Sequence, residues 1–183
     1  VDGRIDRIVP NLGVTQPTFM CGAPRIFEKV RATVLSSNST GLKGNIARWN
    51  ATAKTWSALG EGTTGPVLAI AVLGNDIVAA GAFDSAGTIS ANNIARWSGG
   101  AWKRLGAGEA NGIGTPFFDE VRALATSGQN LYVGGYFTSA SGFTRNRAAA
   151  FDVASGSVTS WNPNANGVVR AILPRGASLF LGG

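Results

Sequence analysis

The sequence contains no histidine. Without imidazole, these residues cannot form Ser-His-Asp or Cys-His nucleophile systems, nor metal sites ligated by histidine. The single cysteine, Cys21, excludes an internal disulfide framework. There is also no run of about 18 apolar residues, so we expect no membrane span. These absences predict a protein that is not an enzyme and has no cofactor or metal site.

Charge is scarce as well. Charged residues make up 14% of the chain, and 16 Lys and Arg against 10 Asp and Glu give a net charge of +6. The basic residues are scattered from Arg4 to Arg175, and their longest run is Lys103-Arg104. A nucleic-acid interface needs basic residues gathered on one face or element. We therefore expect no nucleic-acid partner.

Glycine, in contrast, is abundant, with 26 residues, and 44% of the chain is hydrophobic. A chain of 183 residues can form one domain with a sizeable core. High glycine with little Glu and Lys favours many short strands and tight turns over helices. The composition therefore predicts an all-β fold.

One motif occurs twice, as Asn45–Trp49 and Asn93–Trp97, both reading Asn-Ile-Ala-Arg-Trp. The copies begin 48 residues apart, and each is followed by a second tryptophan, Trp56 or Trp102. Identity at a fixed period is typical of a repeat protein. We expect each copy to form a strand in which the tryptophans pack within the repeat; stacking of a glycan on them is the alternative.

Three longer segments also repeat, at 67–83, 121–137 and 169–183. Each has two apolar runs around a turn rich in Gly, Asn, Asp or Ser, which predicts a β-hairpin. Two further strands are expected after the first two hairpins, at 93–97 and 101–105 and at 146–152 and 157–161. One unit is thus four short antiparallel strands in about 48–54 residues.

Repeated four-stranded units predict the blades of a β-propeller, because stacking against neighbours covers both faces of each small sheet. Residues 1–183 form a single repeat region, with a degenerate blade at 1–44 and clear repeats at 45–183. The count is just under four blades, and the last residues stop within the pattern. We expect an incomplete arc of a longer chain that supplies the remaining blades, with a closed four-bladed ring as the alternative.

The segments Arg145–Asp152, 155–167 and Leu131–Thr138 carry a family resemblance. Leu-Tyr-Val-Gly-Gly-Tyr-Phe-Thr and Trp-Asn-Pro resemble the delta-60-type repeat of bacterial propellers. The Asn-Ile-Ala-Arg-Trp copies are similar to a kelch-like variant in secreted bacterial proteins, and to fungal cortical polarity-marker propellers. The resemblance covers about residues 40–183 and implies an extracellular or cell-surface location.

Residues that break or mark the repeat are the candidate site. Phe117 and Phe118 follow the Gly-rich loop 106–116 and are expected to be exposed aromatic side chains for a ligand. Arg122 and Arg170 recur on the first strand of a blade, where they would attract an anion to a central channel. The alternative for the repeated arginines, including Arg48 and Arg96 on the third strand, is a structural tie between blades.

The carboxylates predict structural roles. Asp119 and Glu120 are adjacent on a strand, so their side chains point to opposite faces and do not form a catalytic dyad. Asp76 is expected to be a turn residue. Asp84 and Asp152 end strands, where they can accept hydrogen bonds from nearby backbone amides.

The predicted function is a non-catalytic extracellular or cell-surface scaffold that presents loops to an unknown protein or carbohydrate ligand. One alternative is a segment of a propeller enzyme whose catalytic residues lie outside these 183 residues. The absence of histidine separates these residues from the copper oxidases built on kelch-like propellers, which need imidazole ligands, and this exclusion applies to these 183 residues alone. The other alternative is a structural protein of the polarity-marker type.

Overall fold

A computed structural model describes residues 44–105, 112–115 and 118–183. These residues form antiparallel strands in several small sheets and no helix, which confirms the all-β class. The chain falls into two compact units. The described part of one is Ala47–Ala58, and the other comprises Gly44–Ile46 and Leu59–Gly183.

The smaller unit is a hairpin of β1 (Ala47–Asn50) and β2 (Thr55–Ala58). The Asn50 carboxamide oxygen accepts hydrogen bonds from two backbone N–H groups of the turn, at 3.0 and 2.9 Å. Trp49 lies opposite Trp56 with the ring centroids 5.1 Å apart. Residues 47–49 of the first Asn-Ile-Ala-Arg-Trp copy therefore lie in a strand, and the Trp49 ring packs against the Trp56 ring of the paired strand.

In the larger unit, the first sheet has four strands in chain order: β3 (Val67–Leu73), β4 (Asp76–Gly81), β7 (Ile94–Ser98) and β8 (Ala101–Arg104). The β3–β4 turn contains Gly74, whose φ of 63° suits a residue without Cβ. This sheet matches the predicted unit of hairpin plus two strands.

The second sheet has three strands: β9 (Glu120–Ser127), β10 (Asn130–Tyr136) and β13 (Ala148–Asp152). The fourth strand predicted at 157–161 is present only in part. Val158 forms a bridge with Phe151 of β13, the Asp152 N–H donates to the Ser157 carbonyl at 2.8 Å and the Thr159 N–H donates to the Ala150 carbonyl at 2.7 Å, but no strand extends through 160–161. The Thr159 carbonyl accepts a hydrogen bond from the Arg145 guanidinium at 2.6 Å. The Trp161 N–H donates to the Thr159 hydroxyl at 3.3 Å. The Thr159 carbonyl and the Trp161 N–H are therefore bonded to side chains and do not pair with a neighbouring strand.

The third sheet is the hairpin β14 (Ala171–Arg175) and β15 (Ser178–Gly182), as the repeat predicts. Two short hairpins were not predicted: β5 (Ser85–Ala86) with β6 (Ile89–Ser90), and β11 (Ser139–Ala140) with β12 (Phe143–Thr144). Each lies between the second and third strands of its repeat. Such a hairpin has strands of two residues, too short for a periodic pattern to reveal.

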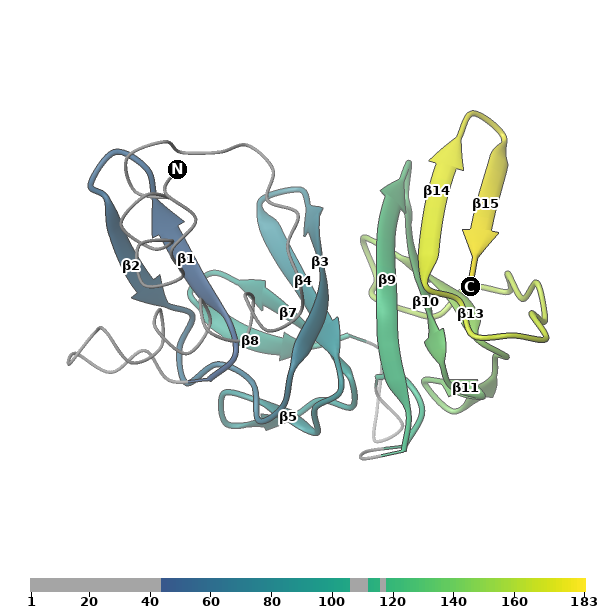
Figure 1. Cartoon of the computed structure of the whole chain (residues 1–183), viewed down its shortest axis with the longest axis horizontal. Helices are drawn as coiled ribbons and strands as arrows, with labels where there is room; N and C mark the ends of the chain where they lie inside the picture. The colour runs from purple at the N-terminus through teal and green to yellow at the C-terminus, as the bar shows by residue number, and fades with distance from the viewer. Residues whose placement is uncertain (1–43, 106–111, 116–117) are drawn as a thin grey trace, which may run out of the picture. The chain divides into compact units, whose positions relative to one another are not determined.

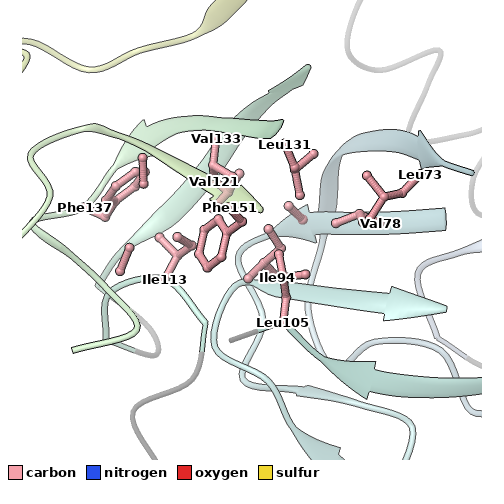
Figure 2. Close-up of a cluster of buried hydrophobic side chains, with 13 residues drawn as sticks. Leu73, Val78, Ile94, Leu105, Ile113, Val121, Leu131, Val133, Phe137 and Phe151 are labelled. Atoms are coloured by element: carbon pink, nitrogen blue, oxygen red, sulfur yellow. The ribbon is translucent and has the colours of Figure 1, made fainter. Parts of the chain in front are cut away.

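Neighbouring sheets pack through their first strands, with β3 beside β9 and β9 beside β14 (Figure 1). The first and second sheets share a core in which Val78 and Ile94 face Leu131 and Phe151, all of them solvent-inaccessible (Figure 2). The third sheet packs on Gly134 of β10. A Cβ at Gly134 would lie 2.5 Å from the Val169 side chain, so the close approach requires glycine.

The other face of the first sheet carries a second apolar cluster. It contains Ala79, Ala95 and Trp102, with Leu59 and Phe83 packed over them. The buried Trp102 indole N–H donates to the Leu59 carbonyl at 2.7 Å, and the Trp97 ring lies 5.2 Å away. The second pair of repeated tryptophans is thus part of the packing, as expected.

Candidate functional site

Of the four residues that the sequence singled out, Phe118, Arg122 and Arg170 lie in the part of the chain that the structure describes. Phe117 lies outside the described residues, as do 106–111 and 116 of the Gly-rich loop. Phe118 is 81% exposed. Arg122 forms an ion pair with Glu120, with Nη2 2.5 Å and Nε 2.7 Å from Oε1, whereas Arg170 is exposed just before β14.

Four of the described carboxylates, those of Asp84, Asp119, Glu120 and Asp152, each contact a side chain or backbone group that the structure describes. The Asp119 carboxylate accepts from the Thr115 N–H at 2.7 Å, while Glu120 pairs with Arg122, so these neighbours act separately. Asp152 accepts from the Ser155 N–H at 2.8 Å, and this bond is the main cause of its lowered pKa. The pKa of Asp84 is lowered chiefly by the Thr64 hydroxyl.

Asp76 corrects one prediction. Its carboxylate does not close the turn but pairs with Arg96 of β7, with Nη2 2.5 Å and Nε 2.7 Å from Oδ2. This contact is the main reason that the pKa of Asp76 is lowered. Arg96 also donates to the Val153 carbonyl at 3.5 Å, so it links the first sheet to the segment after β13. The structural alternative for Arg96 is confirmed.

The strand registers identify equivalent positions in the two sheets. Ile94 lies opposite Ala80, and Ala148 lies opposite Gly134, so residues 54 apart are equivalent. Four of the positions at which the second repeat differs in chemistry carry aromatic or arginine side chains, at the end of β10 or after it. Tyr136, Phe143, Arg145 and Arg147, here named the aromatic–arginine surface, stand where the first repeat has Ala82, Ile89, Ala91 and Asn93.

Tyr136 and Arg147 form the first pair of this surface. The Arg147 guanidinium carbon lies 4.5 Å from the Tyr136 ring centroid, within the range of a cation–π interaction. Arg147 Nη1 also donates to the Phe137 carbonyl at 2.8 Å, which fixes the guanidinium. The Tyr136 ring, 44% exposed, is therefore held in a defined orientation with one side backed by positive charge.

Phe143 and Arg145 form the second pair, on and after β12. Arg145 donates to the carbonyls of Thr144 and Thr159, at 2.8 and 2.6 Å. Its guanidinium carbon lies 5.8 Å from the Phe143 ring centroid. Phe143 is 57% exposed, so a second ring faces solvent beside a fixed cation.

The start of β9 borders this surface. Glu120 lies directly opposite Tyr136 in the sheet and pairs with Arg122. Phe118 precedes Glu120 by two residues. One of the sequence-predicted residues, Arg122, is therefore connected to the aromatic–arginine surface through its ion pair with Glu120, which lies opposite Tyr136.

This chemistry suits binding by stacking and hydrogen bonding. Exposed aromatic rings offer apolar faces, and guanidinium groups donate to oxygen atoms of a ligand. Within residues 44–105, 112–115 and 118–183, no three acidic or cysteine side chains gather in a way that could hold a metal ion. No helix in this described part is long and apolar enough to cross a membrane.

None of the four residues of this surface was among the residues predicted from the sequence. Their signal was present in the alignment of the first two repeats. It required comparison of Tyr136, Phe143, Arg145 and Arg147 with Ala82, Ile89, Ala91 and Asn93, which align once the strand register is known. No protein-family model matches this chain, and the search of curated proteins finds none with significant similarity.

Proposed function

We propose that this chain is part of a β-propeller of the delta-60 or kelch-like kind, an extracellular or cell-surface scaffold without catalytic activity. Support comes from the repeated order of strands, in which the β3–β4 hairpin pairs with β7 and the β9–β10 hairpin pairs with β13. Each sheet packs its first strand beside that of the next, as β3, β9 and β14 do. Blades around an axis have this relation.

We further propose that the aromatic–arginine surface binds a carbohydrate. One observation carries this proposal: two exposed rings, Tyr136 and Phe143, each lie beside a fixed arginine where the first repeat has Ala82 and Ile89. Packing does not require these aromatic side chains, because the equivalent positions in the first repeat lack them. Aromatic rings and guanidinium donors suit the apolar faces and hydroxyl groups of a sugar chain.

A protein ligand is the second candidate. Phe118, 81% exposed, adds apolar area next to Glu120, and exposed aromatic residues and arginine often anchor protein interfaces. A protein interface buries about 800 Å² on each partner, far more than four side chains provide. Carbohydrate is therefore the first candidate.

The test compares the intact chain with a repeat-swap variant on a glycan array and in pull-down experiments. The variant carries Tyr136→Ala, Phe143→Ile, Arg145→Ala and Arg147→Asn, which are the residues of the first repeat. Binding by the intact chain and at least about tenfold weaker binding by the variant are expected. Arg104→Ala is the matched control, since Arg104 is exposed and donates to the Ser90 carbonyl at 3.1 Å.

The two ligand classes give different results. Retention of glycans by the array supports the first candidate, and capture of a protein that the repeat-swap variant fails to capture supports the second. Equal binding by the intact chain and the folded variant, or no binding in either assay, would overturn the assignment of this surface.

A further inference from the structure

The aromatic–arginine surface carries positive charge that the described carboxylates do not neutralise. Arg122, near its border, is paired with Glu120, so this arginine adds no free charge. Arg145 and Arg147 form no ion pair with a carboxylate in residues 44–105, 112–115 and 118–183. Their guanidinium groups donate instead to the backbone carbonyls of Thr144, Thr159 and Phe137. A neutral carbonyl fixes a guanidinium without cancelling its charge, so the surface presents two uncompensated cations.

The two arginines lie on the β13 side of β10. The Gly135 N–H donates to the Arg147 carbonyl at 3.0 Å, and Arg145 precedes Arg147 by two residues. Glu120 lies opposite Tyr136 on β9, at the other side of β10. The carboxylate of Glu120 is already in an ion pair. Unpaired positive charge therefore lies on one side of the strand that carries Tyr136, and a carboxylate lies on the other.

Folding does not require either cation. The equivalent residues of the first repeat are Ala91 and Asn93, which are uncharged. Asn93 has nearly the same positive φ as Arg147, 60° against 62°, so the backbone at this position needs no charged side chain. Arg145 even leaves its buried Nε without a hydrogen-bond partner in the described part of the chain. A buried donor without an acceptor lowers stability, so ligand binding accounts for Arg145 better than packing does.

These observations point to the charge of the ligand. We propose that it is an acidic saccharide, with a carboxylate or sulfate group that pairs with Arg147 beside the Tyr136 ring. This inference rests on the carbohydrate-binding function proposed above. One N–H of the Arg147 guanidinium donates to the Phe137 carbonyl, and the others have no acceptor among the described residues. A guanidinium binds anionic oxygen atoms through charge-assisted hydrogen bonds, which are stronger than those to an uncharged hydroxyl group.

The carboxylate on β9 gives the bound saccharide a direction. An acidic group placed near Glu120 would meet a like charge and compete with it for Arg122. An acidic group placed near Arg147 meets an unpaired guanidinium instead. The acidic sugar therefore lies on the β13 side of Tyr136, and the uncharged part of the saccharide extends across the ring toward β9.

A glycan array of matched pairs tests this proposal with the intact chain. Each uronic-acid oligosaccharide is immobilised beside its methyl ester, and each sulfated oligosaccharide beside its desulfated form, so that the members of a pair differ mainly in charge. Titration calorimetry then measures the dissociation constants of the pair that is retained. The acidic member should bind at least about tenfold more tightly, because a charge-assisted hydrogen bond is roughly twice as strong as a neutral one. The kind of pair that is retained shows whether the acidic group is a carboxylate or a sulfate.

Substitutions assign the preference to the two arginines. Arg145→Ala combined with Arg147→Asn, which are the residues of the first repeat, should reduce the preference for the acidic member to less than about threefold. The control combines Arg48→Ala with Arg104→Ala, which removes two exposed cations elsewhere and should leave the preference unchanged. Arg147→Gln is the second variant if the first does not fold, since glutamine keeps N–H donors without the charge.

The outcomes separate this inference from carbohydrate binding itself. Equal binding of the two members by the intact chain, or a preference that survives in the folded arginine variant, would overturn the acidic ligand and leave carbohydrate binding standing. No retained glycan would overturn both proposals. A single-stranded oligonucleotide also offers stacking rings and anionic groups, so it is a further probe. Tighter binding of that oligonucleotide than of every acidic glycan would overturn the assignment to a saccharide.

Discussion

The Arg147 guanidinium carbon lies 4.5 Å from the centre of the Tyr136 ring while Nη1 donates to the Phe137 carbonyl at 2.8 Å. Arg147 has a φ of 62°, and its first-repeat equivalent, Asn93, has a φ of 60°. The backbone conformation is therefore shared by the two repeats, whereas the side chain is not. In the second repeat, Arg147 adopts the same left-handed conformation as Asn93 and also places its guanidinium against the exposed Tyr136 ring.

This relationship predicts different costs for two substitutions of Arg147. Arg147→Ala should lower the free energy of unfolding by about 1–3 kcal/mol, because it removes the hydrogen bond and the ring contact. Arg147→Asn should cost less, since asparagine tolerates the left-handed conformation and is used at the equivalent position. Urea unfolding measures both; an Asn variant no more stable than the Ala variant would contradict this account.

Gly134 and Gly182 provide a matched pair of substitutions. A Cβ at Gly134 would lie 2.5 Å from Val169 Cγ1, whereas at the repeat-equivalent Gly182 the nearest atom would be 3.8 Å away. Gly134→Ala should therefore destabilise the protein by about 1–3 kcal/mol through overpacking. Gly182→Ala should change stability by less than about 0.5 kcal/mol. Equal effects in thermal or urea unfolding would show that the third sheet does not pack on Gly134.

Asn93 is completely buried, and its carboxamide joins two segments. Nδ2 donates to the Ile113 carbonyl at 2.9 Å, and Oδ1 accepts from the Phe83 N–H at 3.2 Å. Asn93→Ala should cost about 2–4 kcal/mol, because it leaves buried groups unpaired and places alanine at positive φ. The control is Asn92→Ala, since the Asn92 backbone carbonyl accepts a hydrogen bond from the Ile113 N–H, and alanine keeps this carbonyl. Similar unfolding free energies for the two variants would refute the role of the carboxamide.

Low pH should weaken the ion pair between Asp76 and Arg96. The pKa of Asp76 is lowered from 3.8, chiefly by its hydrogen bond with Arg96 and then by that with Ser98. A lowered folded-state pKa gives stability that is present above the unfolded value and is lost as pH falls through the folded value. The stability advantage of the intact chain over Asp76→Asn should therefore shrink below a pH of about 3.8.

Urea unfolding at a series of pH values measures this difference. Asp84 and Asp152 also have lowered pKa values, but both remain in the Asp76→Asn variant, so their contributions cancel in the comparison. A difference that stays constant or grows on acidification would contradict the assigned direction.

The hairpins were predictable because their apolar runs and turn residues are local signals. Residues 67–73 and 76–81 show both, and β3 and β4 follow them closely. The predicted strand at 157–161 pairs with β13 only through Thr159, whose carbonyl accepts a hydrogen bond from Arg145, 14 residues away, a contact that no local pattern reveals. The pairing of Asp76 with Arg96 is equally invisible before the register of β4 and β7 is known.

The candidate surface depends on the same register. Phe118 was predicted because it follows the Gly-rich loop, and Arg122 because it recurs on the first strand of a repeat. The structure connects Arg122 to Tyr136 through Glu120. Phe143 and Arg145 became candidates only when the short β11–β12 hairpin aligned them with β5–β6. The local sequence pattern thus predicts the strands. The side chains that distinguish one repeat from another can be identified only when the pairing of distant strands is known.

The contact of each sheet with its immediate neighbours has a consequence for how the molecule opens. Protection of amide protons should be graded along the chain, since a middle sheet is supported on two sides and a terminal hairpin on one. The amides of Leu131 and Val133, in completely buried residues of β10, should exchange with deuterium most slowly. Those of β14 and β15 should exchange earlier, without unfolding of the first two sheets.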